Sequence, residues 1–240
     1  MSEAVGRELA VEPLGETALL LRFGEGLDPA INRRVHSAKS ALRGANLPGL
    51  YDIVPAYATL ALYYEPAAWL DRNGSQPWRN LEAAVRAVLA TPPVAETVAP
   101  RVIEVPVCYG GDFGPDLAAV ASHAKLAAAD VIARHTAVTY TVAMLGFAPG
   151  FPYLFGLDPA LETPRRANPR TRVPSGSVAI GGAQTGIYPS ELSGGWQLIG
   201  RTPLALFDAR RDPPSLLMPG DRVRFVAIDA ALFAARSAQP

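Results

Sequence analysis

Four arginines stand close together in the second half of the chain, and their spacing is the strongest chemical signal in the sequence. Arg165, Arg166, Arg170 and Arg172 fall between residues 165 and 172, with Glu162 as the only acidic residue nearby. Two guanidinium groups about 6 Å apart repel by about 3 kcal/mol at an effective dielectric constant of ~20. The cluster is therefore solvated, paired with acids from distant sequence, or used to hold a carboxylate or phosphate through paired hydrogen bonds.

Glycines and aromatic residues surround this cluster. Ten glycines lie between residues 146 and 200. Taken singly, each is more typical of a tight turn, but glycine also lets backbone N–H groups approach an anion or an amide. Gln184 and Thr185 are short polar residues where a core strand would carry apolar ones. Tyr188 and Trp196 can supply an apolar wall with a polar tip.

The other reactive side chains give weaker signals. His36, His123 and His135 are too far apart in the sequence to indicate a metal site, and we predict none. His135 is the one candidate acid or base whose ordinary pKa is near neutral, although a lone histidine is more often structural. Cys108 is expected to be a small buried apolar residue. The sequence contains neither a P-loop nor a GxGxxG motif.

Composition excludes several classes of protein. The 240 residues include 22 Lys or Arg and 22 Asp or Glu, and this zero net charge argues against nucleic-acid or anionic-membrane binding. Hydrophobic residues make up 49% and charged residues 18%, which favours a folded chain. No apolar run approaches the roughly 20 residues that span a bilayer, and the first residues lack the pattern of a signal peptide. We therefore expect a soluble, cytoplasmic protein.

The first part of the chain is expected to be a small α/β unit. Asp28 is typical of a helix N-cap, Pro29 suits the first helical position, and Gly44 is the expected stop. The expected elements are two short strands around Gly15, a helix from Pro29 to about Arg43, strand material over residues 50–64 and a second helix over residues 79–90.

The second part is expected to be rich in short strands. After a strand from residue 102 and short helices over residues 116–121 and 130–135, apolar runs broken by Gly and Pro begin at residue 139. This pattern is typical of a barrel or sandwich. We therefore predict an N-terminal domain at residues 1–92, a proline-rich linker at 93–101, and a second domain at 102–240 that carries the site.

Over residues 130–205 the sequence resembles the carboxyltransferase C/D family. The stretches that carry the resemblance are GFAPGFPYL, PRRANPRTRVP, GSVAIGGAQTGIYP and GGWQLIGRTP, and together they are highly specific. The pattern extends from about residue 9 to residue 228. The resemblance implies an α+β fold: a small ferredoxin-like N-terminal α/β domain followed by a cyclophilin-like β-barrel.

The same resemblance implies a function. It points to one component of an ATP-dependent 5-oxoprolinase complex, which cleaves 5-oxo-L-proline to L-glutamate with partner subunits of PxpC type, a related barrel, and PxpA type. ATP would be a co-substrate of the complex at a site that several subunits can share, and the isolated chain would be inactive. Two alternatives stay open: a KipI-type inhibitor of a sensor histidine kinase, and a carboxyltransferase partner of a biotin-dependent enzyme similar to urea carboxylase. This chain has no biotin-attachment pattern.

Carried over residue by residue, the motifs indicate nine site residues. The arginines would hold a carboxylate or phosphate, Gln184 and Thr185 would hydrogen-bond an amide, Tyr188 and Trp196 would wall the pocket, and His135 would serve as acid or base. The expected catalytic residues are His135, Arg166, Gln184 and Tyr188, and the expected substrate-binding residues are Arg165, Arg172, Thr185, Trp196 and Arg201.

Overall fold

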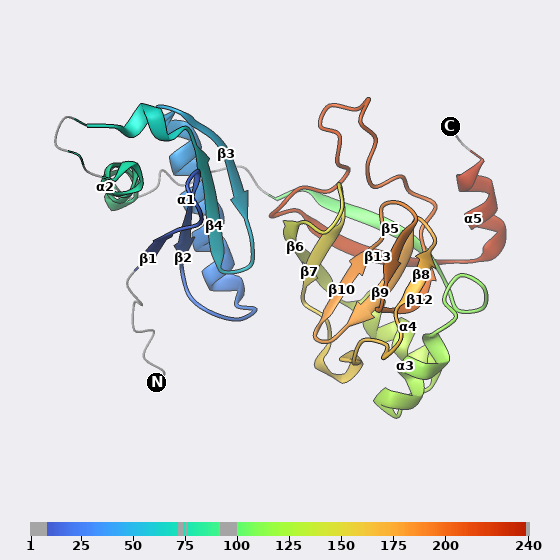
Figure 1. Ribbon diagram of the computed structural model, residues 1–240. Coiled ribbons are helices and arrows are strands. Elements are labelled where there is room, and N and C mark those ends of the chain that lie inside the picture. Colours follow the sequence, from blue (N-terminus) through green and yellow to red (C-terminus); the bar gives the residue numbers. More distant parts are fainter. Residues whose placement is uncertain (1–8, 72–73, 75, 92–99, 239–240) are drawn as a thin grey trace. The chain divides into compact units, whose positions relative to one another are not determined.

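The chain folds into two compact units, Met1–Val98 and Ala99–Pro240 (Figure 1). The computed structural model describes residues 9–71, 74, 76–91 and 100–238. The linker predicted over residues 93–101 lies outside the described residues except for Pro100 and Arg101. The predicted boundaries at residues 92 and 102 therefore stay a prediction.

The first unit is an antiparallel four-stranded sheet with two α-helices. Its sheet order is β1-β2-β4-β3. This is a ferredoxin-like arrangement. The edge strand beside β2 is β1, from the start of the unit, whereas in the usual ferredoxin-like order this edge strand follows the second helix. The elements are β1 (Ala10–Pro13), β2 (Ala18–Arg22), α1 (Pro29–Ala45), β3 (Leu50–Pro55), β4 (Thr59–Tyr64), the short helix η1 (Pro66–Trp69) and α2 (Pro77–Ala90).

Alternation along the strands explains why both helices cover one face of this sheet. Leu19 and Leu21 of β2 point to the same side as Leu60 and Leu62 of β4, and all four are fully buried. Against them pack Val35 and Leu42 of α1 together with Leu81 and Val85 of α2.

Helix α1 begins as predicted but ends later. The Asp28 carboxylate accepts a hydrogen bond from the N–H of Ala30 at 2.6 Å, which confirms the N-cap. The predicted stop at Gly44 is wrong, because the helix continues through Gly44 to Ala45. Asn46 ends it in the left-handed conformation, with φ of 46°. Asparagine tolerates this conformation better than most residues, so it takes the position that glycine was expected to fill.

The second unit is a closed seven-stranded barrel, as the cyclophilin-like expectation required. The strand order around the barrel is β10-β7-β6-β13-β5-β12-β9, and β8 and β11 form a separate two-stranded sheet. The elements are β5 (Val102–Tyr109), α3 (Leu117–Ala124), α4 (Ala128–Ala137), β6 (Thr139–Leu145), β7 (Pro152–Phe155), the short helix η2 (Pro159–Leu161), β8 (Arg170–Val173), β9 (Ser177–Gly181), β10 (Gln184–Ile187), β11 (Leu192–Gly194), β12 (Gln197–Arg201), β13 (Arg222–Ile228) and α5 (Ala230–Ser237).

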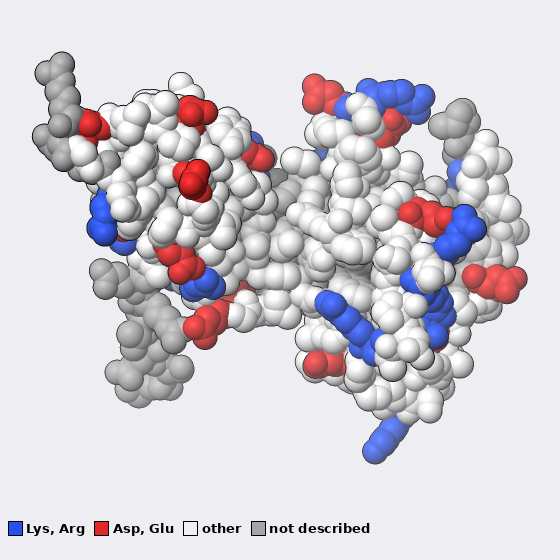
Figure 2. Space-filling view, viewed as in Figure 1, with Lys and Arg blue, Asp and Glu red and all other residues white. Residues whose placement is uncertain are grey.

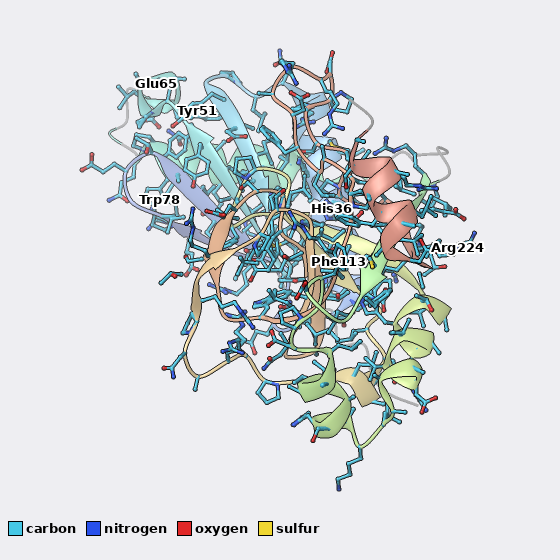
Figure 3. All side chains as sticks on the ribbon, turned by 90° about the vertical axis from the view of Figure 1, so that its right-hand side faces the viewer. His36, Tyr51, Glu65, Trp78, Phe113 and Arg224 are labelled. Atoms are coloured by element: carbon cyan, nitrogen blue, oxygen red, sulfur yellow. The ribbon has the colours of Figure 1, made fainter. Side chains whose placement is uncertain are left out.

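Two contacts place the helical parts of this unit. Helix α5 lies beside Phe113 (Figure 3), whose ring centroid is 4.6 Å from that of Phe233. Asp116 was predicted to begin a helix, but α3 starts at Leu117 and the Asp116 side chain makes no capping hydrogen bond. Its carboxylate instead accepts hydrogen bonds from side chains about fifty residues later in the chain.

The wall of the barrel has an apolar cluster on each face. Successive residues of a strand point to opposite sides. On β9, Val178 and Ile180 therefore join the interior core, whereas Ala179 joins an outer cluster. The buried members of this outer cluster are Phe151, Val173, Ala179, Tyr188, Trp196 and Leu198. The arginine-rich segment lies on this outer side.

Candidate functional site

The segment that carries the arginines is fastened to the barrel at two points. The N–H of Gly182, in the β9–β10 turn, donates to the carbonyl of Thr163 at 2.8 Å. The N–H of Arg166 donates to the carbonyl of Gly195, just before β12, at 2.7 Å. Residues 163–166 are thereby held between the β9–β10 turn and the β11–β12 connection. Figure 2 shows basic side chains on the face of the barrel unit where β8, β9 and β12 lie in Figure 1.

One buried carboxylate gathers two of the arginines. Asp116 accepts hydrogen bonds from Arg170 at 2.7 and 2.8 Å and from Arg166 at 3.1 Å. It also accepts one from the N–H of Leu198 at 2.7 Å. Only 6% of the Asp116 side chain is exposed. The cluster is thus partly neutralised by an acid about fifty residues earlier, which was one of the three possibilities that the sequence left open.

The electrostatics of this contact favour the ionised carboxylate. Burial alone would raise the pKa of Asp116. The hydrogen bonds from Arg170 and from the Leu198 N–H, with the charges of Arg170 and Arg166, outweigh it, so the pKa lies below its usual value. Asp116 therefore stays charged and holds both guanidinium groups in place.

An aromatic wall stands beside the arginines. The rings of Phe151 and Tyr153 lie 5.7 and 5.9 Å from that of Trp196, and Phe151 lies 5.2 Å from Tyr188. Glycine is required where the wall meets the strand. A Cβ at Gly181 would lie 2.6 Å from the Trp196 ring. Trp196 can therefore lie flat on β9 only because this position has no side chain.

Arg165 differs from its neighbours because it lies on the aromatic wall. Its guanidinium carbon is 5.6 Å from the centroid of the Trp196 ring, within the range of a cation–π contact. The residue is exposed, whereas Arg166 and Arg170 are half-buried on Asp116. Arg165 is therefore the guanidinium of this group that is best placed to receive an anion from solvent.

Gln184 and Thr185 were predicted to bind one amide together, but they lie on opposite faces of β10. Gln184 is the register partner of Gly181, the residue beneath Trp196, and it is half-buried. Thr185 is fully buried and points into the barrel. Adjacent residues of a strand cannot share a face, so only Gln184 belongs with the arginine and aromatic groups.

His135 lies in the interior of the barrel, fully buried. Its Nε2 is 3.1 Å from the Thr185 hydroxyl, which donates to the carbonyl of Ala179 at 3.1 Å. Its Nδ1 is 2.8 Å from the Tyr109 hydroxyl. Because Thr185 donates its proton to Ala179, Nε2 carries the hydrogen, and Nδ1 accepts from Tyr109.

Burial also sets the charge of His135. Desolvation lowers the pKa of His135 to about 3, so the ring is neutral at physiological pH. Its ring stacks on Phe225 with centroids 4.5 Å apart. This geometry fits a structural role, in which His135 of α4 is hydrogen-bonded to β5 and β10, better than the role of an acid or base that contacts substrate.

The two remaining predicted residues lie apart from the Asp116 contact. The Arg172 guanidinium pairs with Glu191 at 2.8 Å, and both side chains are exposed. The Arg201 Nε donates to the carbonyl of Ser175 at 2.7 Å. Neither interaction links them to Trp196 or Asp116.

The structure therefore brings together five of the nine predicted residues. They are Arg165, Arg166, Gln184, Tyr188 and Trp196. Sequence reasoning missed Asp116, Arg170 and Tyr153 as members. For Asp116 the signal was misleading, because an Asp just before a helix is typical of an N-cap.

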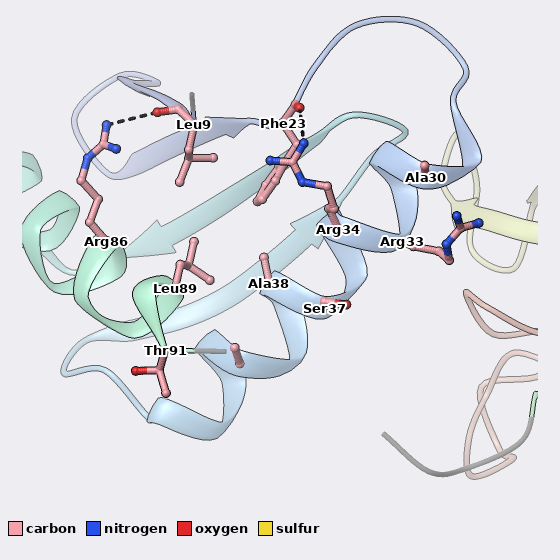
Figure 4. Close-up of a pocket in the computed structure, with 11 residues that line it drawn as sticks. Leu9, Phe23, Ala30, Arg33, Arg34, Ser37, Ala38, Arg86, Leu89 and Thr91 are labelled. Atoms are coloured by element: carbon pink, nitrogen blue, oxygen red, sulfur yellow. Dashed lines mark hydrogen bonds between the residues drawn. The ribbon is translucent and has the colours of Figure 1, made fainter. Parts of the chain in front are cut away.

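A separate cavity of 810 Å³ lies in the first unit (Figure 4). Arg34 and Arg86 at its edge donate to the carbonyls of Phe23 and Leu9. Its lining is formed by Leu9, Phe23, Ala30, Arg33, Arg34, Ser37, Ala38, Ala41, Arg86, Leu89 and Thr91, none of which was predicted as a site residue. None of its residues belongs to the sequence stretches that carry the family resemblance, so the barrel site remains the candidate site.

Two features are absent from the residues that the structure describes. In residues 9–71, 74, 76–91 and 100–238, no three His, Cys, Asp or Glu side chains converge as metal ligands. No helix among these residues has both the length and the apolar character needed to cross a bilayer. Cys108 is buried, as predicted.

The fold and the site define a class of protein: a ferredoxin-like unit followed by a cyclophilin-like barrel, with arginines and aromatic rings on the outer wall. Residues 9–217 match the family described as "Carboxyltransferase domain, subdomain C and D". The chain belongs to this family.

Two relatives align over nearly the whole chain. It is 44% identical over 221 residues to the 5-oxoprolinase B subunit of Bacillus subtilis (strain 168), covering 91% of this chain and 92% of the relative. It is also 44% identical to the 5-oxoprolinase B subunit of Escherichia coli O157:H7, covering 89% and 93%.

Solved structures support the fold. The structure of TTHA0988 is 43% identical, with a TM-score of 0.75 over 89% of this chain, although the chain spans only 40% of that protein. The urea carboxylase of Kluyveromyces lactis, at 19% identity and a TM-score of 0.73, covers 95% of this chain and shares the fold; the chain spans 22% of that enzyme.

Proposed function

We propose that this chain is the B-type subunit of an ATP-dependent 5-oxoprolinase complex and acts with PxpC-type and PxpA-type subunits. The observation that carries the proposal is the position of Arg165 on the face of the Trp196 ring. Asp116 holds Arg166 and Arg170 beside it. Gln184 lies on the neighbouring strand, opposite Gly181 of β9. The relatives named as 5-oxoprolinase B subunits support it, since they align over about nine-tenths of the chain.

The groups fit the chemistry of 5-oxoproline. This substrate carries a carboxylate on a nearly planar lactam ring. Arg165 suits the carboxylate, and the partly buried ring of Tyr153 beside Trp196 suits the lactam ring. Gln184 carries both a donor and an acceptor, which a lactam N–H and C=O require.

The requirement for ATP follows from the weak electrophilicity of a lactam. In the proposed reaction the γ-phosphoryl group of ATP passes to the lactam oxygen, and ADP leaves. Water then adds to the activated ring carbon, and the carbon–nitrogen bond of the ring breaks to leave γ-glutamyl phosphate. A second water hydrolyses this acyl phosphate to glutamate and free phosphate. The developing negative charge on the transferred group suits the half-buried Arg166 and Arg170, which Asp116 fixes in position.

In this proposal the remaining predicted residues act indirectly. Tyr188 supports the aromatic wall, and Thr185 with His135 hold β10 from inside the barrel. Arg172 and Arg201 lie outside the substrate contact. No proton transfer is assigned to His135.

The test is glutamate release from 5-oxoproline and ATP by this chain with its two partner subunits, each omitted in turn. We expect glutamate only from the full set. Arg165→Ala should lose activity, whereas the matched Arg210→Ala, which removes an exposed guanidinium paired with Asp208, should not. A full, assembled complex that forms no glutamate would overturn the proposal, and carboxyl transfer to an amide would then be the reaction to assay.

A further inference from the structure

The three arginines at the site are held in different ways. Asp116 binds the guanidinium groups of Arg166 and Arg170 through directional hydrogen bonds. The Arg165 guanidinium is exposed and lies over the Trp196 ring, and a cation–π contact at an exposed site is weak. An arginine side chain has many rotamers, so the direction in which the backbone presents Arg165 decides where its guanidinium is found.

Two hydrogen bonds to the barrel bracket Arg165 in the chain. On its C-terminal side, the N–H of Arg166 donates to the carbonyl of Gly195 at 2.7 Å. On its N-terminal side, the side-chain amide of Gln197 donates from Nε2 to the carbonyl of Pro164 at 2.9 Å. The first bond joins two main-chain groups and can form with almost any residue, whereas the second needs a side chain that carries an N–H donor. The Gln197 bond is therefore the one that depends on residue type.

Gln197 reaches the arginine segment from the wall of the barrel. It is the first residue of β12, follows Trp196 directly and is half-buried. Its register partner is Ile180 of β9. The next residue, Leu198, is buried in the outer cluster, and its N–H donates to Asp116 at 2.7 Å. The amide of Gln197 therefore extends from a well-fixed strand, which suits a group that holds another residue in place.

We propose that Gln197 is a positioning residue for Arg165 and thereby sets how strongly the site selects a lactam that carries a carboxylate. The inference rests on the proposed function, in which Arg165 holds that carboxylate. The bond to Pro164 fixes the backbone immediately before Arg165, so the guanidinium lies over Trp196 before substrate arrives. A preorganised group loses less freedom on binding than a mobile one. The contribution of Gln197 therefore belongs to substrate binding and not to the chemical step.

The first test needs neither substrate nor a partner subunit. In the full chain with Trp69 and Trp78 replaced by Phe, the emission of Trp196 reports on the cation above its ring. Gln197→Met keeps the length of the side chain and removes the donor. We expect it to change the emission in the same direction as Arg165→Ala, and the double variant to match Arg165→Ala alone. Unchanged emission in Gln197→Met, or additive changes in the double variant, would overturn the positioning role.

The second test is kinetic and uses the assembled complex. Gln197→Met should raise KM for 5-oxoproline about three- to tenfold, as expected for the loss of one neutral hydrogen bond, and should leave kcat within about twofold. The inhibition constant of 2-pyrrolidinone, the same lactam ring without the carboxylate, should stay unchanged. An equal rise for both compounds, or a fall in kcat with KM unchanged, would indicate a general loosening of the site and overturn the proposal.

Ser175→Ala is the matched control, because the Ser175 hydroxyl also donates to a proline carbonyl of the barrel unit, that of Pro189, at 2.9 Å. Its KM and its Trp196 emission should equal those of the parent chain. Failure of this inference differs from failure of the proposed function. An assembled parent complex that forms no glutamate would overturn the proposed function, whereas the emission of Trp196 would still decide whether Gln197 positions Arg165.

Discussion

Asp116→Asn tests the reasoning on the arginine cluster most directly, because it removes one charge and keeps the shape of the side chain. The carboxylate is 6% exposed, and its Arg166 and Arg170 partners are 36% and 24% exposed. Removing one partner of a buried ion pair costs about 3–5 kcal/mol. Water can replace part of the loss at half-exposed arginines, so we expect about 2–3 kcal/mol of lost stability.

The assay is urea unfolding followed by the fluorescence of Trp196. The chain has three tryptophans, Trp69, Trp78 and Trp196, so replacing the first two with Phe leaves a reporter confined to the barrel unit. In a double-mutant cycle with Arg170→Met, the coupling free energy should be at least about 1 kcal/mol. Additive losses would refute the idea that Asp116 and Arg170 form one stabilising contact.

The stability difference between the parent chain and Asp116→Asn is also expected to depend on pH. The pKa of Asp116 is lowered from 3.8 in the folded state, so its contribution is complete at pH values above 3.8 and is lost as pH falls through the lower, folded-state value. The stability difference between the parent chain and Asp116→Asn should therefore shrink below pH 3.8. A difference that stays constant there would contradict the assigned charge.

Three further predictions concern single residues. Arg165→Ala should lower kcat/KM for 5-oxoproline about 10- to 100-fold in the assembled complex, mainly through KM, with assembly by gel filtration unchanged. Because the pKa of His135 is lowered to about 3, the folded chain resists protonation there, and stability should fall as pH drops from 6.5 towards 3. The slope should approach about 1.4 kcal/mol per pH unit, and His135→Phe should flatten it in urea titrations; an unaltered slope would contradict the burial argument. Gly181→Ala should displace Trp196 and shift its emission, since the new Cβ would lie 2.6 Å from the ring. Gly44→Ala, which meets nothing within 4 Å in helix α1, is the control and should stabilise the first unit by about 1 kcal/mol.

Local signals were enough to predict much of the fold. The N-cap at Asp28 and the paired strands around Gly15 each depend on residues that are close together in the sequence. The structure confirms both. The end of α1 was missed because Gly44 and Asn46 both tolerate the left-handed conformation, and the local sequence does not indicate which of the two ends the helix.

The site was harder to predict because its decisive contact is not local. Nothing near Arg166 and Arg170 in the sequence indicates that their acid is Asp116. It lies about fifty residues earlier in the chain, before α3, α4, β6, β7 and the short helix η2. Motifs mark which residues matter together, but not which face of a strand each occupies. Thr185 and His135 were therefore grouped with residues from which the barrel wall separates them.

Gln184 and Thr185 are adjacent polar residues of β10, and their side chains lie on opposite faces of the strand, where each has a different role. An inward-facing polar residue such as Thr185 is costly unless it is hydrogen-bonded. Thr185 meets that condition by accepting from His135 and donating to Ala179 of the neighbouring strand β9. This network ties β10 to β9 and α4 from within. The same two strands carry Gln184 and Gly181 on the outside, where Trp196 rests. A rigid interior thus fixes the outer platform, so loss of the His135 network should loosen the proposed substrate site without any direct contact between the two.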